Sequence, residues 1–167
     1  MNNELTKTDI EKMRAELDER RLKLMPELIE EVRRTRAFGD LSENYEYKAA
    51  KQAQNRNRSR IRYLERMIAS AKVIEDTSAD DEVGLYDKVE VYMVEDGETN
   101  TVRVVTTVRC DPLNGLISKD SPLGAALLGR RVGDRVSVQV SKEYGYTAEV
   151  RSIEKGSDDG SAALLQY

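Results

Sequence analysis

The residues of this chain best suited to chemistry are two carboxylates, Asp40 and Glu43, in the run Gly39–Asn44. The 167 residues include no His and one Cys, Cys110, so Ser–His or Cys–His catalysis and His-ligated metal sites are excluded. A lone thiol forms neither an intramolecular disulfide nor a Cys-x-x-Cys zinc site, and we expect Cys110 to be a small core residue. Catalytic chemistry must therefore rest on carboxylates, Lys, Tyr or Arg.

The spacing of the two acids also has a purely structural explanation. Gly39 is typical of the left-handed residue that ends a helix, so the next helix would start at Asp40. Asp-x-x-Glu at a helix start is close to a capping box, in which each side chain accepts a hydrogen bond from a backbone N–H. Acidic groups also stabilise the positive end of the helix dipole. On spacing alone capping is the favoured interpretation, and a functional carboxylate pair is the alternative.

Two long helices are predicted to flank this turn. The first runs from about Thr8 to Arg36, with Thr8 or Asp9 as its N-cap, and its apolar residues recur at helical spacing. Pro26 interrupts this stretch, and we expect a kink or the loss of one hydrogen bond there. The apolar positions are Ile10, Met13, Leu17, Leu24, Leu28 and Val32.

The second helix has a regular seam, with spacings that alternate between three and four residues as in a coiled coil. Because the connection between the helices is short, they must run antiparallel as a hairpin. Gln54 and Asn57 are polar members of the seam, so we expect weaker packing in mid-hairpin and a role in fixing the register. The seam consists of Tyr47, Ala50, Gln54, Asn57, Ile61, Leu64, Ile68 and Ala71.

The periodicity changes to that of strands in the second half of the chain. Residues 77–86 are polar and acidic, and they predict a linker between a hairpin domain, residues 1–76, and a β domain, residues 87–155. Residues 156–167 are predicted to be a flexible tail. The fold class is therefore α+β, with an N-terminal antiparallel helical hairpin followed by an antiparallel β domain with one short helix.

Composition and charge limit the classes of function. No run approaches the roughly 20 apolar residues of a membrane span, and we expect a soluble cytoplasmic protein with no membrane partner. The net charge of −4 conceals an asymmetry of +2 over residues 1–76 and −6 over the remainder. Residues 48–66 hold seven basic groups against Glu65 alone, a pattern that can face nucleic acid. A solvated helix face explains that charge equally well.

Two motifs resemble those of a known family. The run from Gly39 to Ala50, GDLSENYEYKAA, resembles the GDLxENxEYxAA motif of the Gre (GreA/GreB) transcript cleavage factors. The run from Ser121 to Asp134, SPLGAALLGRRVGD, resembles the family's SPLGxALLGKxxGD element. Both halves align in order, so the resemblance covers about residues 8–155.

This resemblance implies a fold and a mechanism. Factors of the family have an FKBP-like C-terminal domain that binds bacterial RNA polymerase, and they insert their coiled coil into its secondary channel. There they stimulate cleavage of the 3′ end of backtracked nascent RNA and rescue arrested complexes. By this resemblance Asp40 is a direct or water-mediated ligand of a Mg²⁺ ion shared with polymerase, and Glu43 positions the attacking water. The factor is expected to be a monomer without nuclease activity of its own.

Further residues carry over from the family in the same way. Asp120, Ser121 and Pro122 match the loop that contacts polymerase, although an ordinary strand-to-helix turn with an Asp or Ser cap would explain them too. The basic residues Arg36, Lys48 and Lys51 lie near enough to the tip in sequence to attract the extruded RNA, or they are simply solvated. Tyr47 matches the family, but its seam position suits packing equally well.

Three departures from the family pattern and two other functions remain open. Tyr45 is bulkier than the common Ala, Ser42 replaces a frequent Lys, and residues 56–58 make the mid-hairpin more basic. One alternative is therefore a Gre-like paralogue that occupies the channel and inhibits or regulates polymerase without cleavage. A prolyl isomerase is the other, but Val89–Tyr144 holds two Tyr and no Phe or Trp for an aromatic pocket.

Overall fold

The computed structural model describes residues 3–39 and 44–166, and these fold as two compact units. One unit is helical and consists of Ile10–Lys72. The other joins the N-terminal residues up to Asp9 with Val73–Gln166. Among the described residues, no helix is both long enough and apolar enough to cross a membrane.

The first arm of the helical hairpin consists of α1 (Lys7–Glu19), a π-helical turn η1 (Arg20–Leu24) and α2 (Met25–Arg36). At the start of α1, Thr6 and Asp9 each accept a hydrogen bond from the backbone N–H of the other, as in a capping box. The Thr6 N–H donates to Oδ2 of Asp9 at 2.8 Å, and the Asp9 N–H donates to Oγ1 of Thr6 at 3.2 Å. The capping residue is thus Thr6 rather than the predicted Thr8 or Asp9, because Asp9 serves as the distal half of the box.

Pro26 accounts for the π-helical turn. Proline has no N–H, and in an α-helix its ring would collide with the carbonyl of Leu22, four residues earlier. The wider turn relieves that collision, and the Met25 N–H donates to the carbonyl of Arg20, five residues back. The predicted interruption at Pro26 therefore takes the form of a π-turn that ends before the proline.

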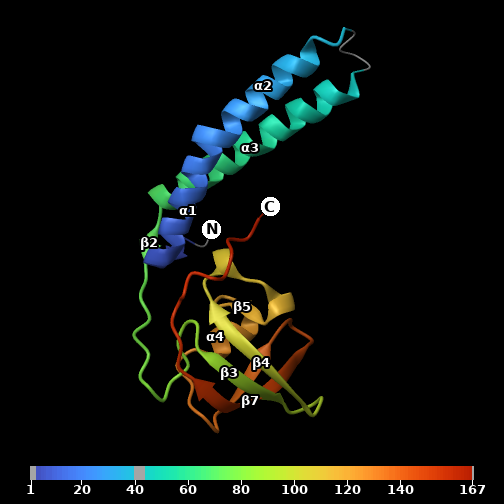
Figure 1. Ribbon diagram of the computed structural model, residues 1–167. Helices are drawn as coiled ribbons and strands as arrows, with labels where there is room; N and C mark the ends of the chain where they lie inside the picture. The colour runs from blue at the N-terminus through green and yellow to red at the C-terminus, as the bar shows by residue number, and fades with distance from the viewer. Residues whose placement is uncertain (1–2, 40–43, 167) are drawn as a thin grey trace. The chain divides into compact units, whose positions relative to one another are not determined.

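The second arm is α3 (Tyr45–Ala69), which packs along α2 (Figure 1). Its buried face includes Ala50, Gln54, Asn57 and Leu64, as the seam predicts. At two other seam positions the prediction is wrong, because Arg60 and Met67 are buried and the neighbouring Ile61 and Ile68 are only half-buried. The side chains of Arg60 and Met67 are long and unbranched. Each can therefore extend over the facing arm from a position next to the predicted one.

A polar network occupies mid-hairpin. Arg60 donates from Nε to Oε1 of Glu16 at 2.8 Å and from its terminal nitrogen to Oε2 at 3.0 Å. Arg20 donates to the same Oε1 at 2.8 Å and to Oδ1 of Asn57 at 3.0 Å. The amide of Asn57 in turn donates to the Arg20 carbonyl at 3.3 Å. These bonds join the arms only in one alignment, so they fix the register as expected for polar seam residues.

This network predicts a pH dependence. Burial alone would raise the pKa of Glu16, but the hydrogen bonds and charges of Arg60 and Arg20 together hold it below its ordinary value of 4.5. The stability contributed by ionised Glu16 is therefore complete above about pH 4.5 and is lost as the pH falls through the lower folded-state value. The unfolding temperature should fall more on acidification in the wild type than in Glu16→Gln, as followed by circular dichroism. Equal acid sensitivity of the two proteins would contradict this account.

The globular unit is built on a five-stranded sheet of order β5-β4-β3-β7-β6 (Figure 1). Neighbouring strands are antiparallel except β4 and β5, which are parallel, so the sheet is mixed rather than wholly antiparallel. The turn between β3 and β4 contains Gly97 in the left-handed region, at φ +69°. The strands are β3 (Lys88–Met93), β4 (Glu98–Val105), β5 (Leu116–Ser118), β6 (Arg135–Gln139) and β7 (Gly145–Glu154).

Shorter elements complete the unit. Helix α4 (Pro122–Leu127) packs against the sheet, and its Leu127 is fully buried in the core. The turns η2 (Thr107–Arg109) and η3 (Pro112–Asn114) connect β4 to β5. A separate two-stranded sheet pairs β1 (Glu4–Leu5) with β2 (Lys72–Val73).

The core extends into the stretch predicted to be a linker. Val83, Leu85 and Tyr86 are buried with the sheet residues rather than exposed. The Tyr86 N–H donates to the carbonyl of Val104 at 2.9 Å, and that of Gly84 donates to the Asp87 carboxylate at 2.7 Å. These residues have neither helical nor strand periodicity, so their sequence does not indicate burial.

A buried Arg109 cluster holds the segment that follows β7. Arg109 is fully buried and donates to both carboxylate oxygens of Asp158 at 2.6 and 2.8 Å, and to Oδ1 of Asp9 at 3.1 Å. Its Nε donates to the carbonyl of Ala162 at 2.7 Å, and the Leu165 N–H reaches the Val108 carbonyl at 2.7 Å. Residues 158–165, expected to be a flexible tail, are thus hydrogen-bonded to the globular unit.

Candidate functional site at the tip of the hairpin

Asp40 and Glu43 lie outside the described residues, and the structure defines the two helix ends that frame them. Helix α2 ends at Arg36, and the Phe38 N–H donates to the Thr35 carbonyl at 3.2 Å. Gly39 follows with φ +100°, which confirms the prediction of a left-handed glycine after the first helix. The backbone is therefore defined from the end of α2 at Arg36 up to Gly39, the residue immediately before Asp40.

The second helix begins later than the spacing of the acids predicts. Its N-cap is Asn44, which has an extended backbone and accepts a hydrogen bond from the Tyr47 N–H at 3.0 Å. The prediction that α3 starts at Asp40, with Glu43 as its capping partner, is therefore wrong. Asn caps helices as well as Asp does, and Asn44 is nearer to the first turn. Asn44 therefore occupies the N-cap position that the spacing had assigned to Asp40.

Asn44 also contacts the other arm. Its side-chain nitrogen donates to the carbonyl of Thr35 at 2.7 Å, across nine residues of sequence. Thr35 is itself fully buried, and its hydroxyl donates to the carbonyls of Glu31 at 2.9 Å and Val32 at 3.2 Å. Sequence analysis missed both residues, although an Asn directly before an amphipathic helix is a recognisable cap signal.

Aromatic and basic side chains surround the two helix ends. Phe38 is 55% exposed and Tyr45 is 80% exposed. The Arg34 guanidinium lies 5.2 Å from the Phe38 ring centre, and the Lys48 Nζ lies 5.6 Å from that of Tyr45. Each ring is thus associated with a cation, a contact that is weak at an exposed site.

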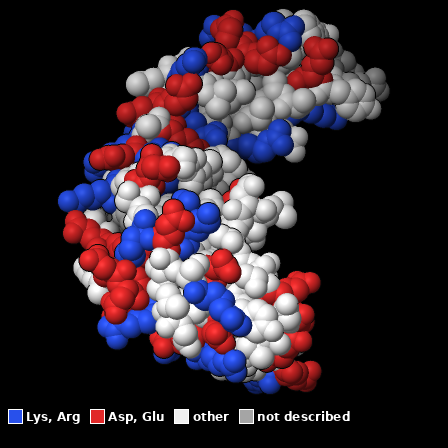
Figure 2. Space-filling model, turned by 60° about the horizontal axis from the view of Figure 1, so that its bottom comes forward, with Lys and Arg blue, Asp and Glu red and all other residues white. Residues whose placement is uncertain are grey.

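The basic residues predicted to face nucleic acid are all on the surface. Arg36, Lys48 and Lys51 are exposed, and the Lys51 ammonium donates a long hydrogen bond of 3.5 Å to Oε1 of Gln54. Arg60, counted in the same basic stretch, is instead buried against Glu16. Figure 2 shows Lys and Arg interspersed with Asp and Glu on the face in view, so the helical unit is not uniformly basic. Tyr47 is half-buried, which fits its packing role.

The loop before α4 shows how Asp120, Ser121 and Pro122 are held. Ser121 is the N-cap of α4 and accepts a hydrogen bond from the Gly124 N–H at 3.1 Å, so its structural role is real. Asp120 and Pro122 are exposed. Asp120 accepts hydrogen bonds from the Thr107 hydroxyl at 2.8 Å and the Lys119 ammonium at 3.2 Å, which orient its carboxylate. Hydrogen bonds thus hold this turn, and the side chains of Asp120 and Pro122 are exposed on it.

Two family models match the chain, one in each half. Residues 3–73 match the N-terminal model of the transcription elongation factors GreA and GreB, and residues 78–155 match their C-terminal model. Together the matches span most of both units. The chain belongs to the GreA/GreB transcription elongation factor family. It is therefore a transcription elongation factor, and the resemblance seen in its motifs is confirmed.

Two relatives with similar sequences support the assignment to the GreA/GreB family. The chain is 44% identical to the transcription elongation factor GreA of Thermotoga neapolitana and 45% identical to that of Geobacillus kaustophilus. Each alignment covers 81% of this chain and 86% of the relative. The solved structure of GreA factor homolog 1 from Thermus thermophilus is 30% identical, with 91% of this chain and 98% of that one covered and a TM-score of 0.41.

The donor chemistry of this GreA/GreB family member suits magnesium. Mg²⁺ prefers oxygen ligands and is commonly held by one or two carboxylates together with water. Asp40 and Glu43 supply such groups. Within residues 3–39 and 44–166, no group of three or more Asp, Glu or Cys side chains could enclose a metal ion.

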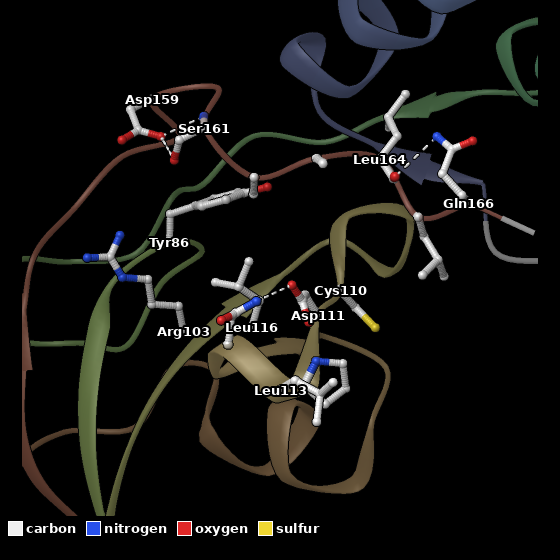
Figure 3. Close-up of a pocket in the computed structure, with 15 residues that line it drawn as sticks. Tyr86, Arg103, Cys110, Asp111, Leu113, Leu116, Asp159, Ser161, Leu164 and Gln166 are labelled. Atoms are coloured by element: carbon white, nitrogen blue, oxygen red, sulfur yellow. Dashed lines mark hydrogen bonds between the residues drawn. The ribbon is translucent and has the colours of Figure 1, made fainter.

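A cleft in the globular unit is separate from the tip residues. It has a volume of about 570 Å³ and lies between the η2–β5 region and the segment after β7 (Figure 3). Asp111, Leu113 and Leu116 form one wall, and residues 159–166 contribute the other. Among the described residues that line it, Tyr86 supplies the only aromatic ring. Cys110 is half-buried at its edge, packed against the core rather than within it.

Proposed function

We propose that this chain is a transcript cleavage factor that acts through bacterial RNA polymerase. It inserts its helical hairpin into the secondary channel and stimulates endonucleolytic cleavage of the 3′ end of backtracked nascent RNA, which rescues arrested complexes. The observation that carries the proposal is the match of both halves of the chain to the GreA/GreB family, together with the acid pair in the run from Gly39 to Ala50. Asn44, and not Asp40, is the N-cap of α3.

Asp40 and Glu43 have separate tasks in this proposal. Asp40 ligates Mg²⁺ directly or through water, and Glu43 orients the water that attacks the phosphodiester. The ion, held jointly with polymerase, would lower the pKa of that water and stabilise charge on the phosphate oxygens. Two carboxylates in bulk solvent hold Mg²⁺ weakly, so we expect no tightly bound ion and no nuclease activity without polymerase.

Surface side chains provide the remaining contacts. The exposed Arg36, Lys48 and Lys51 attract the extruded RNA by charge, an effect that salt would weaken. The exposed Asp120 and Pro122 on the turn before α4 contact polymerase, and Ser121 holds that turn in shape. This division separates polymerase binding from the chemistry at the tip.

A cleavage assay on stalled, backtracked elongation complexes tests the proposal. Addition of the factor should accelerate release of short 3′ RNA fragments and restore elongation when nucleotides are supplied. The factor incubated with the same RNA but without polymerase should release nothing. Slowed RNA synthesis without fragment release would instead identify a paralogue that occupies the channel and inhibits.

A further inference from the structure

We propose that Thr107 and Ser118 are positioning residues that hold the carboxylate of Asp120 in place to accept hydrogen bonds from polymerase. The proposal rests on the polymerase contact proposed above, and it adds two hydroxyl groups that need not touch the partner. All three residues belong to the globular unit. Thr107 is the first residue of η2, Ser118 is the last residue of β5, and Asp120 lies in the turn that follows β5.

The three residues form a closed ring of hydrogen bonds, and the direction of each bond follows from the available protons. The ionised carboxylate of Asp120 has no proton, so the Thr107 hydroxyl donates to its Oδ2 at 2.8 Å. A hydroxyl has a single proton, so in the 2.7 Å contact between the two hydroxyls Ser118 donates to Thr107. The Asp120 N–H donates to the Ser118 Oγ at 3.1 Å, which closes the ring. Each hydroxyl therefore donates one bond and accepts another.

The backbone that carries the ring is anchored to the sheet. Ser118 pairs with Val105 in the parallel ladder between β4 and β5, and the Lys119 N–H donates to the Val105 carbonyl at 2.8 Å. Thr107 follows β4 two residues after Val105. Groups supported by strands are held more precisely than groups supported by loops alone. The ring thus fixes an exposed carboxylate relative to the ends of two paired strands.

Asp120 retains the capacity to accept hydrogen bonds from a partner. Its Oδ2 accepts from Thr107 and its Oδ1 accepts from the Lys119 ammonium at 3.2 Å. A carboxylate oxygen can accept two hydrogen bonds, and the Asp120 side chain is 45% exposed. Lys119 also pairs with Glu4, so the charges of these three groups sum to −1. The turn therefore fits a polymerase surface that presents a positively charged hydrogen-bond donor.

The ring should increase the affinity of the factor for polymerase, because a side chain that is already ordered loses less freedom on binding. Thr107→Val replaces the hydroxyl by a methyl group of similar size, and Ser118→Ala removes the second hydroxyl. Both variants should bind polymerase roughly three- to tenfold more weakly. Thr107→Ser keeps the hydroxyl and should bind within about twofold of the wild type. The matched control is Thr101→Val, which removes an exposed hydroxyl of β4 outside the ring and should also bind like the wild type.

A double-mutant cycle with Asp120→Ala separates positioning from a general effect on the fold. Asp120→Ala removes the carboxylate, so Thr107→Val should not weaken binding further in that background. Competition with labelled wild-type factor measures the affinities, at a temperature at which calorimetry shows every variant to be folded. In the cleavage assay, Thr107→Val should raise the half-saturating concentration of factor roughly three- to tenfold. It should leave the maximal cleavage rate unchanged, because the hydroxyl acts on binding alone.

The possible outcomes distinguish the positioning role from the proposed function. Wild-type affinity of Thr107→Val, or an equal loss of affinity in the Asp120→Ala background, would overturn the positioning role while the proposed function stands. Weak binding by Thr107→Ser, or an equal loss in Thr101→Val, would overturn it as well. If Asp120→Ala binds like the wild type, the polymerase contact of Asp120 fails and the positioning role fails with it. If the factor binds through Asp120 but does not stimulate cleavage, the proposed function fails, and the affinities alone decide the positioning role.

Discussion

Replacement of both Asp40 and Glu43 by alanine should abolish stimulated RNA cleavage while the factor still binds polymerase. The reason is that carboxylates placed where charge develops act mainly on the transition state, and loss of one such group typically costs 100-fold or more in rate. Polymerase affinity should persist, since it is assigned to the turn before α4 and to the hairpin surface. The measurements are fragment release at saturating factor and competition for polymerase with labelled wild type.

The matched control for this pair is Glu46→Ala. Glu46 is an exposed acid in the first turn of α3, so its removal changes the local charge by the same sign in the same region. It should retain nearly full cleavage. Asp40→Asn and Glu43→Gln preserve shape and should each fail as severely as the alanine variants if charge is what matters. A double alanine variant that cleaves at the wild-type rate would refute the assignment of both acids.

The second large effect is expected at Arg109. Substitution of Arg109 by Met retains much of its volume but leaves Asp9 and Asp158 without their cation, and breaking a buried ion pair in this way typically costs about 3–5 kcal/mol. The unfolding temperature of the globular unit should fall by roughly 10 °C or more, because 1 kcal/mol corresponds to about 4–8 °C in a domain of this size. Differential scanning calorimetry would measure the change.

The control for Arg109 is Arg103→Met, because Arg103 is exposed on the neighbouring strand β4 and its loss should be nearly neutral. Asp158→Ala should be milder than Arg109→Met, since Asp9 still pairs with the guanidinium. Equal stability of Arg109→Met and wild type would show that the cluster contributes little. Full helicity of α3 in every variant would localise the effect to the globular unit.

The same cluster predicts acid sensitivity. Burial would raise the pKa of Asp158, but the Arg109 hydrogen bonds and the Gly160 N–H outweigh it and hold that pKa below its ordinary value of 3.8. Its contribution is therefore complete above about pH 4 and is lost as the pH falls below that value. The loss of stability on acidification should be smaller in Asp158→Asn, as calorimetry across this range would show.

Local patterns were sufficient to predict the two arms of the hairpin. The spacing of apolar residues predicted both arms, and Gly39 correctly marked the end of the first. Asn44 was missed because Asp40 and Asn44 are both good caps, and spacing alone cannot choose between them. Arg60 was assigned to the surface because charge is usually exposed, but its partner Glu16 lies 44 residues away.

Long-range contacts account for the remaining errors. Arg109 bonds to Asp9 from 100 residues away, and nothing in the sequence around either residue indicates that pairing. The segment after β7 has the composition of a loop, so its attachment to Arg109 could not be predicted. The parallel pairing of β5 with β4 depends on the path of the chain through η2 and η3. The alternation of apolar residues predicts strands but does not predict that path.

The π-helical turn gives the first arm a place where chain length can change. A turn bonded five residues back contains one residue more than an α-helical turn, and α-helix continues on both sides of it. A deletion of one residue within Arg20–Leu24, combined with replacement of Pro26, could restore continuous α-helix on both sides. This turn is therefore the place in the first arm where a single residue can be removed with the least disturbance of the helices on either side.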